Sequence, residues 1–304
     1  MKALEAGKRI TLNNILFATD FSPRSDAALP YAVAIARQYG ATIYGAHVAS
    51  SEDYLFTAPD LWPSRLQHEK ELEQEVLKHL DEQLGGAKHE ALFGVGDVWQ
   101  ALSGFIGEHD IDLLVIGTHG RTGARKLLMG SIAERIFRQA TCPVVSIGPN
   151  VASKREDEIQ FRHILLATDF GAESLASLPF AFSLAEETQA RLTLLHVIDQ
   201  PAAGIIDLEA ATASVRRRLN ELIPPDAEAW CHVECLVEFG QQFALPAQRI
   251  LEVATDREKD QAADLIILGV RPTHRAVSAV THLAHTTAQH IVAHATCPVL
   301  TVRG

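Results

Sequence analysis

The sequence predicts an α/β protein made of two similar domains, each with a parallel β-sheet covered by helices on both faces. Two observations support this prediction. The second half of the chain repeats the motifs of the first half in the same order, and within each half short apolar runs alternate with longer segments of helical periodicity. Such alternation is typical of parallel strands joined by right-handed crossovers.

The internal repeat covers nearly the whole chain. NILFATDF at residues 14–21 returns as HILLATDF at 163–170, an offset of 149 residues (163 − 14). ATCPVVSIG at 140–148 returns as ATCPVLTVRG at 295–304, an offset of 155 residues (295 − 140). Offsets of this length indicate duplicated domains and not a solenoid.

The boundary between the two copies is predicted in a polar segment. Residues 149–160 are rich in charge and lack apolar periodicity, as is typical of a linker. We therefore expect two domains, repeat one at residues 1–150 and repeat two at 151–304.

The elements of repeat one follow from its hydrophobic pattern. The apolar run at 15–20 predicts a strand, and apolar residues at spacings of three and four predict a helix at 28–40, with Gly40 as its C-cap. Leucines and valines at helical spacing predict a longer helix at 66–84. The remaining alternation predicts strands at 41–48, 90–96, 113–118 and 144–148, and helices at 98–110 and after Gly130.

Composition narrows the classes of function. A net charge of −11 argues against binding to nucleic acid or anionic membranes through general electrostatics. The start MKALEAGKRI lacks a long apolar segment, and no run of 18 uncharged apolar residues occurs, so we expect a cytoplasmic protein without a transmembrane helix. Four cysteines in 304 residues are too few for a disulfide framework, so we expect reduced thiols.

A glycine-rich segment follows the strand predicted at 113–118. Gly117 and Gly120 describe a turn, and Gly130 followed by Ser131 opens a helix. The N–H groups of a helix start, the Ser131 hydroxyl and the helix dipole together suit an anion. The spacing matches neither the GxxxxGK[ST] phosphate loop nor the GxGxxG dinucleotide turn.

Asp20 is predicted to face these glycines. In an open α/β sheet, ligands bind at the carboxyl ends of the strands, where the strand order reverses. The ends of the first and fourth strands therefore form one crevice, with Ala18, Thr19 and Asp20 on one lip and Gly117 and the residues after it on the other. We interpret this crevice as a site for a phosphate-bearing ligand.

These residues resemble the universal stress protein family in its tandem form. The resemblance consists of the G-x2-G-x9-G-[ST] spacing, the strand-end Asp of ILFATDFS and the TCPVV strand, and it extends over both repeats. It implies Rossmann-like (adenine nucleotide alpha hydrolase-like) domains with five parallel strands each. It also implies that the terminal strands pair the two repeats as a pseudo-dimer.

The same resemblance implies an adenine nucleotide, ATP with or without Mg²⁺, in repeat one. It places Asp20 and the backbone around Ala18, Thr19 and Val48 near the adenosine. The other residues that it implies surround the ribose and phosphates or line the site: Gly117, Gly120, Gly130, Ser131, Ile116 and Ile132. No catalytic residue and no metal ligand are predicted.

Repeat two departs from this pattern. Asp169 and Gly269 remain, but Pro272 replaces the second glycine and His285 replaces the third. Proline lacks a backbone donor, and a histidine in place of a left-handed glycine would strain the backbone and fill the phosphate space. We expect repeat two to bind ATP weakly or not at all.

Histidine pairs in repeat two leave a second ligand open. His290 and His294, and also His282 and His285, have a spacing at which a helix can chelate a metal, although no cysteine or carboxylate stands at ligand spacing nearby. His47 and His196, at matching strand ends, are expected to be hydrogen-bonded structural residues and not bases.

Three classes of function remain open. The first is a nucleotide-binding regulatory protein in which repeat two serves as a scaffold, within a homodimer or with an unidentified protein partner. The second is a slow ATP hydrolase or nucleotidyl-transfer enzyme, against which stand the missing Walker lysine and the lack of an evident nucleophile–base pair. The third is an interaction scaffold with a vestigial pocket.

Overall fold

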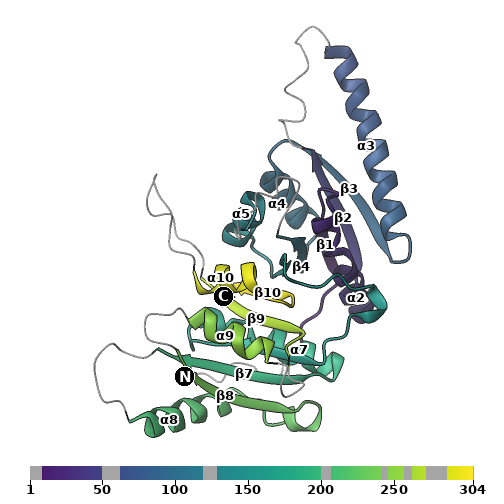
Figure 1. Ribbon diagram of the computed structural model, residues 1–304. Helices are drawn as coiled ribbons and strands as arrows, with labels where there is room; N and C mark the ends of the chain where they lie inside the picture. Colours follow the sequence, from purple (N-terminus) through teal and green to yellow (C-terminus); the bar gives the residue numbers. More distant parts are fainter. Residues whose placement is uncertain are drawn as a thin grey trace, which may run out of the picture.

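A single ten-stranded sheet forms the centre of the described part of the protein. The computed structural model describes residues 9–49, 62–118, 129–199, 207–240, 246–256, 262–271 and 286–303. The strand order is β3-β2-β1-β4-β5-β10-β9-β6-β7-β8, with the strands of repeat one in one half and those of repeat two in the other (Figure 1). This confirms the predicted α/β class with two similar halves.

Each repeat contributes five strands in the order 3-2-1-4-5. The strands of repeat one are β1 (Asn14–Ala18), β2 (Thr42–Ala49), β3 (His89–Val95), β4 (Leu113–Gly117) and β5 (Val144–Ile147). Those of repeat two are β6 (His163–Ala167), β7 (Arg191–Ile198), β8 (Val233–Phe239), β9 (Leu265–Val270) and β10 (Val299–Arg303).

The helices lie between the strands in the same order in both repeats. In repeat one they are α1 (Pro23–Asp26), α2 (Leu29–Tyr39), α3 (Trp62–Leu84), α4 (Val98–Glu108) and α5 (Ser131–Gln139). In repeat two they are α6 (Ala172–Ala176), α7 (Leu178–Thr188), α8 (Leu208–Asn220), α9 (Pro246–Thr255) and α10 (Thr287–His294). Two short 3-10 turns, η3 (Glu156–Glu158) and η4 (Ala227–Ala229), complete the described elements.

The two halves are joined by the antiparallel pairing of β5 with β10. Val144, Val145 and Ser146 lie opposite Thr301, Leu300 and Val299, whereas every other neighbouring pair in the sheet is parallel. Terminal strands therefore pair the repeats as a pseudo-dimer, as the family resemblance implied.

The core is continuous across the junction on one face of the sheet. There, α2 and α7 cover a cluster that includes Phe17 and Ile35 of repeat one and Leu166 and Leu184 of repeat two. On the other face the core divides into two clusters. One lies under α4 and α5, and the other lies under α9 and α10.

Several element boundaries differ from those predicted. The first strand ends at Ala18, so Thr19 and Asp20 lie in the following turn and not in the strand. The sequence analysis missed α1, whose start is set by the N-cap Ser22 and by Pro23 in the first helical turn. The helix predicted at 66–84 begins four residues earlier, at Trp62, and Gly40 caps α2 with φ 66° as predicted.

We expect Leu300→Ala to destabilise the protein by roughly 2–5 kcal/mol, because it leaves a cavity in the core shared by both halves. Leu300 is 1% exposed, and the control, Leu208→Ala, removes a side chain that is 50% exposed. Urea unfolding followed by circular dichroism measures both variants. Equal unfolding midpoints for the two variants would contradict a structural role for the shared core.

Candidate functional site

The candidate site lies at the carboxyl ends of β1 and β4, where the strand order of repeat one reverses. β1 pairs with β2 on one side and with β4 on the other, so Ala18 lies between Ala46 and Ile116. Ile116 is 4% exposed and belongs to the core, and Val48 is partly buried in β2. The fold thus brings these predicted lining positions to one edge of the sheet.

The turn after β1 is held by the buried side chain of Thr19. Its hydroxyl donates to Asp26 Oδ1 at 2.7 Å and accepts from the N–H of Phe21 at 2.9 Å. The Ser25 hydroxyl lies 2.9 Å from the hydroxyl oxygen of Thr19. The side chain of Thr19 therefore shapes the turn, in which Phe21 takes a positive φ of 58°, and the predicted backbone contact of Thr19 with a nucleotide stays a prediction.

Asp20 lies partly buried on this turn. Its Oδ1 accepts a hydrogen bond from the N–H of Ser22 at 3.0 Å, and its own N–H donates to Ser25 Oγ at 3.3 Å. These contacts fix the direction of the carboxylate at the edge of the crevice.

His47 supports the turn from β2. Its Nδ1 donates to the carbonyl oxygen of Thr19 at 2.9 Å, and its ring stacks on Phe21 with the centroids 4.6 Å apart. His196 makes the equivalent bond to Thr168 at 2.7 Å in repeat two. Both histidines are hydrogen-bonded structural residues, as predicted.

Gly117 is required by packing. A Cβ atom at this position would lie 2.5 Å from the carbonyl oxygen of Arg24 and 2.7 Å from Cα of Ser25. Gly269, its equivalent in repeat two, would place a Cβ 2.2 Å from the backbone nitrogen of Ser174. The close approach of α1 to Gly117 and of α6 to Gly269 therefore explains both glycines, and no ligand is needed to account for them.

Gly130 marks the start of α5 without adopting a left-handed conformation. Its φ is −59°, so the left-handed backbone expected at this position is wrong. Its N–H donates to the carbonyl oxygen of Thr118 at 2.9 Å, and an added Cβ would lie 3.2 Å from that oxygen. A side chain at this position would therefore crowd the residue that follows β4.

The first turn of α5 has no side-chain cap. Gly130 is its N-cap, and Ser131 and Ile132 are exposed. The first N–H groups of a helix have no partner within the helix, and the dipole gives that end a partial positive charge. This helix start can therefore hold an anion. Gly120 lies outside the described residues.

The sequence analysis missed an ion pair beside this helix start. Asp97 caps α4 by accepting from the N–H of Gln100 at 2.9 Å, and its other oxygen lies 2.5 Å from Nη1 of Arg135 on α5. The hydrogen bond from the Gln100 N–H is the largest cause that lowers the pKa of the Asp97 carboxyl, and the hydrogen bond from Arg135 lowers it further. An Asp directly before an apolar run, like Asp97 before α4, is a sequence signal for an N-cap, but the sequence does not indicate that Arg135 is its partner.

In repeat two, hydrogen bonds and ion pairs hold the carboxylate of Asp169 at the equivalent strand end. Asp169 accepts from the N–H of Gly171 and the hydroxyl of Ser174, both at 2.8 Å. Arg271, at the end of β9, lies 3.4 Å from Asp169 and 3.8 Å from Glu173. Burial raises the pKa of Asp169, but the hydrogen bonds from Ser174 and Gly171 and the charge of Arg271 outweigh it and leave the pKa below its usual value.

The start of α10 is capped by its own residues. The Thr286 hydroxyl accepts from the N–H of Gln289 at 3.3 Å, and Gln289 Oε1 accepts from the N–H of Thr286 at 3.0 Å. The N-cap of α5, Gly130, has no side chain with which to make such a capping box. Pro272 and His285, on which the sequence-based expectation rested, lie outside the described residues.

The described residues contain no group of three or more side chains placed to hold a metal ion. His290 and His294 stack with their ring centroids 4.2 Å apart, and His294 Nδ1 donates to the carbonyl oxygen of His290. The other predicted pair, His282 and His285, lies outside the described residues. Within the described ranges, no helix combines the length and apolar character that crossing a membrane requires.

Comparison with known sequences identifies the family. The chain belongs to the universal stress protein family, whose sequence profile matches residues 11–147 and 160–303. A universal stress protein of Methanocaldococcus jannaschii is 33% identical over 138 residues, which are 44% of this chain and 80% of that protein. A homologue of universal stress protein A from Coxiella burnetii is 32% identical over 139 residues, 44% of this chain and 94% of that protein.

Solved structures agree with the tandem fold. A universal stress protein from Archaeoglobus fulgidus superposes with a TM-score of 0.66 and 20% identity, covering 97% of this chain and 99% of that one. One from Pseudomonas aeruginosa gives a TM-score of 0.59 and 15% identity over 96% of this chain and 93% of that one. At these identities the likeness establishes the fold alone.

Gly117→Ala should destabilise the protein by about 1–3 kcal/mol, because the new methyl group would push apart β4 and α1. The matched control is Gly107→Ala, in the helix α4 with no atom within 4 Å of the added Cβ. That control should stabilise by about 0.5–1 kcal/mol through helix propensity. Chemical denaturation measures both, and a neutral Gly117→Ala would refute the packing explanation.

Arg271→Gln should raise the pKa of Asp169 towards its usual value, because one of the charges that favours the carboxylate is lost. In the native protein the lowered pKa stabilises the fold at pH above the unfolded carboxyl pKa, and this stabilisation is lost as the pH falls through the folded pKa. An NMR pH titration of Asp169 tests this. Arg135→Gln is the control. If the pKa of Asp169 is unchanged in Arg271→Gln, the hydrogen bonds from Ser174 and Gly171 alone account for its low value.

Proposed function

We propose that repeat one binds an adenine nucleotide, ATP with or without Mg²⁺, and that repeat two acts as a scaffold with a closed nucleotide site. Within the cell, the occupancy of repeat one would follow the nucleotide level and report it to a protein partner through a change in shape or association. Ligand binding stabilises only the state that it occupies, which is the physical basis for such reporting.

The residues proposed to bind the nucleotide come from both lips of the crevice. Asp20, with the backbone of Ala18 and Thr19 and with Val48, would contact the adenosine. The start of α5 would hold the phosphates through N–H groups and the Ser131 hydroxyl. The further proposed contacts are Ile116, Gly117, Gly120, Gly130 and Ile132.

The observation that supports this proposal best is the difference between the two equivalent helix starts. Helix α5 begins at a glycine without a side-chain cap, whereas Thr286 and Gln289 close the start of α10. A phosphate at α5 would bind exposed N–H groups, but at α10 it would have to displace two hydrogen bonds.

The charged side chains at the other lip of each crevice also support nucleotide binding in repeat one rather than in repeat two. Asp169 is already paired with Arg271, so a ribose hydroxyl would compete with an ion pair in repeat two. In repeat one the residue at the position of Arg271 is His119, which lies outside the described residues. The two crevices thus share their backbone geometry and differ in the side chains that a nucleotide would meet.

We expect Ser131→Ala to weaken ATP binding by about ten-fold or more, because a hydrogen bond to a charged phosphate is lost. The apo protein should keep its stability, since Gly130 and not Ser131 is the N-cap of α5. Thr286→Ala, at the position equivalent to Ser131, should instead change stability and not ATP binding. It should cost about 1 kcal/mol of stability through loss of a cap and leave ATP affinity unchanged.

Isothermal titration calorimetry with ATP and urea denaturation give the two readouts for each variant. Asp20→Ala and Asp169→Ala form a second matched pair, in which only Asp20→Ala should weaken binding. One nucleotide per chain is expected. Two per chain, or none, would overturn the proposal.

A further inference from the structure

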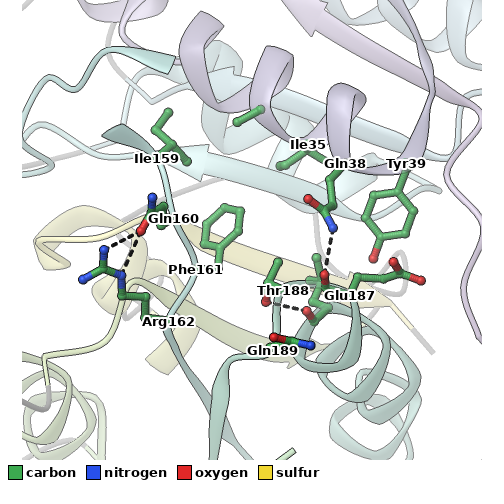
Figure 2. A pocket seen from close by; sticks show the side chains of 12 residues that line it. Ile35, Gln38, Tyr39, Ile159, Gln160, Phe161, Arg162, Glu187, Thr188 and Gln189 are labelled. Atoms are coloured by element: carbon green, nitrogen blue, oxygen red, sulfur yellow. Dashed lines mark hydrogen bonds between the residues drawn. The ribbon is translucent and has the colours of Figure 1, made fainter. Parts of the chain in front are cut away.

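The two repeats meet on both faces of the sheet. On one face α2 and α7 meet, and Gln38 Nε2 donates to the backbone oxygen of Glu187 at 2.8 Å (Figure 2). These two residues are equivalent at the offset of 149 residues. On the opposite face lie α5 and α10, the two helices whose starts differ in capping. Contacts on this second face therefore involve the helix proposed to hold the phosphates.

Repeat two holds the last turn of α5. The half-buried guanidinium of Arg303, at the end of β10, donates from Nη2 to the backbone oxygen of Phe137. The Phe137 side chain packs against the core cluster of repeat two under α9 and α10. Carbonyl groups in the last turn of a helix have no partner within the helix, and a cation stabilises that end of the helix dipole. Arg303 therefore caps the C-terminus of α5 from the other repeat.

The equivalent contact at α10 has a different chemistry. At the offset of 155 residues, Gly148 corresponds to Arg303. A Cβ atom on Gly148 would lie 2.8 Å from the backbone oxygen of Val292, the residue equivalent to Phe137, which leaves no room for a side chain. Instead, the Asn150 amide donates to the backbone oxygen of the last residue of α10 at 3.2 Å. The last turn of α10 thus receives a neutral donor, whereas that of α5 receives a cation.

Helix α5 connects the Arg303 contact to the proposed phosphate site. The helix has nine residues, so its two ends are roughly 13 Å apart. Its first turn supplies the N–H groups that would bind the phosphates, and its last turn is held by Arg303. A rigid element of this kind can carry coupling between two sites, because movement at one end displaces the other.

We propose that Arg303 is a positioning residue for the nucleotide site, and that nucleotide binding in repeat one strengthens the attachment of α5 to repeat two. This inference rests on the proposed function of α5, and it names the route by which occupancy reaches the second repeat. Coupling between two binding equilibria is reciprocal. Loss of the Arg303 contact should therefore weaken nucleotide binding, and a bound nucleotide should tighten the contact.

Calorimetry with ATP on the full chain tests the effect on affinity. Arg303→Met keeps a long side chain but loses the charge and the donor, and it should weaken ATP binding about five-fold. Arg303→Lys keeps a charged donor and should restore most of the native affinity. The matched control is Asn150→Ala, which removes the equivalent contact at α10 and should leave ATP affinity unchanged. Native affinity in Arg303→Met, or an equal loss in Asn150→Ala, would overturn the proposal.

Amide hydrogen exchange measures the contact itself. Without nucleotide, Arg303→Met should speed exchange in the last turn of α5, and Asn150→Ala should do so in α10, because each variant loses the bond that holds one helix end. In the native protein, ATP at saturation should slow exchange in the last turn of α5. This slowing should be lost in Arg303→Met. Unchanged exchange in α5 of unliganded Arg303→Met would contradict a positioning role.

Together the two measurements separate this inference from the proposed function. If the native protein binds ATP and Arg303→Met binds it equally well, the role of Arg303 fails and nucleotide binding stands. If the native protein binds no ATP, the proposed function fails, and the coupling fails with it whatever the exchange data show.

Discussion

The antiparallel pairing of β5 with β10 is the contact on which the rest of the molecule depends. Without it, each repeat would expose the edge of its terminal strand, which is a liability for any sheet. With it, ten strands share one sheet, and Leu300 at the pairing belongs to a core that extends under α2 and α7. The junction between the two repeats takes its position from this pairing.

The two crevices show which motif residues serve the fold and which can serve a ligand. Thr19 and Thr168 accept the same turn hydrogen bond, and Gly117 and Gly269 admit the same close approach. Features that both repeats share cannot by themselves indicate a ligand site in one of them. The discriminating positions are Ser131 and Thr286, where one helix start is uncapped and the other is capped.

Much of the fold could be predicted from the sequence, because hydrophobic periodicity and the repeat are local signals. The C-cap at Gly40 and the end of α3 at Leu84 were found this way. The Asp97–Arg135 and Asp169–Arg271 pairs could not be predicted, because each joins residues far apart in sequence through the sheet topology. The left-handed conformation expected of Gly130 was wrong, because glycine spacing alone does not determine φ, whereas its predicted role at a phosphate stays a prediction.

Covalent duplication explains why such asymmetry can persist. In a homodimer, symmetry would put the same side chain at both equivalent positions, so a change that closes one crevice would close the other. In a tandem chain, Thr286 can cap α10 while its equivalent Ser131 is the first residue of α5, after the N-cap Gly130. The same freedom places different side chains at the equivalent positions Gln38 and Glu187, which touch at the junction. Divergence between equivalent positions is therefore a direct guide to where a tandem protein of this kind has separated its functions.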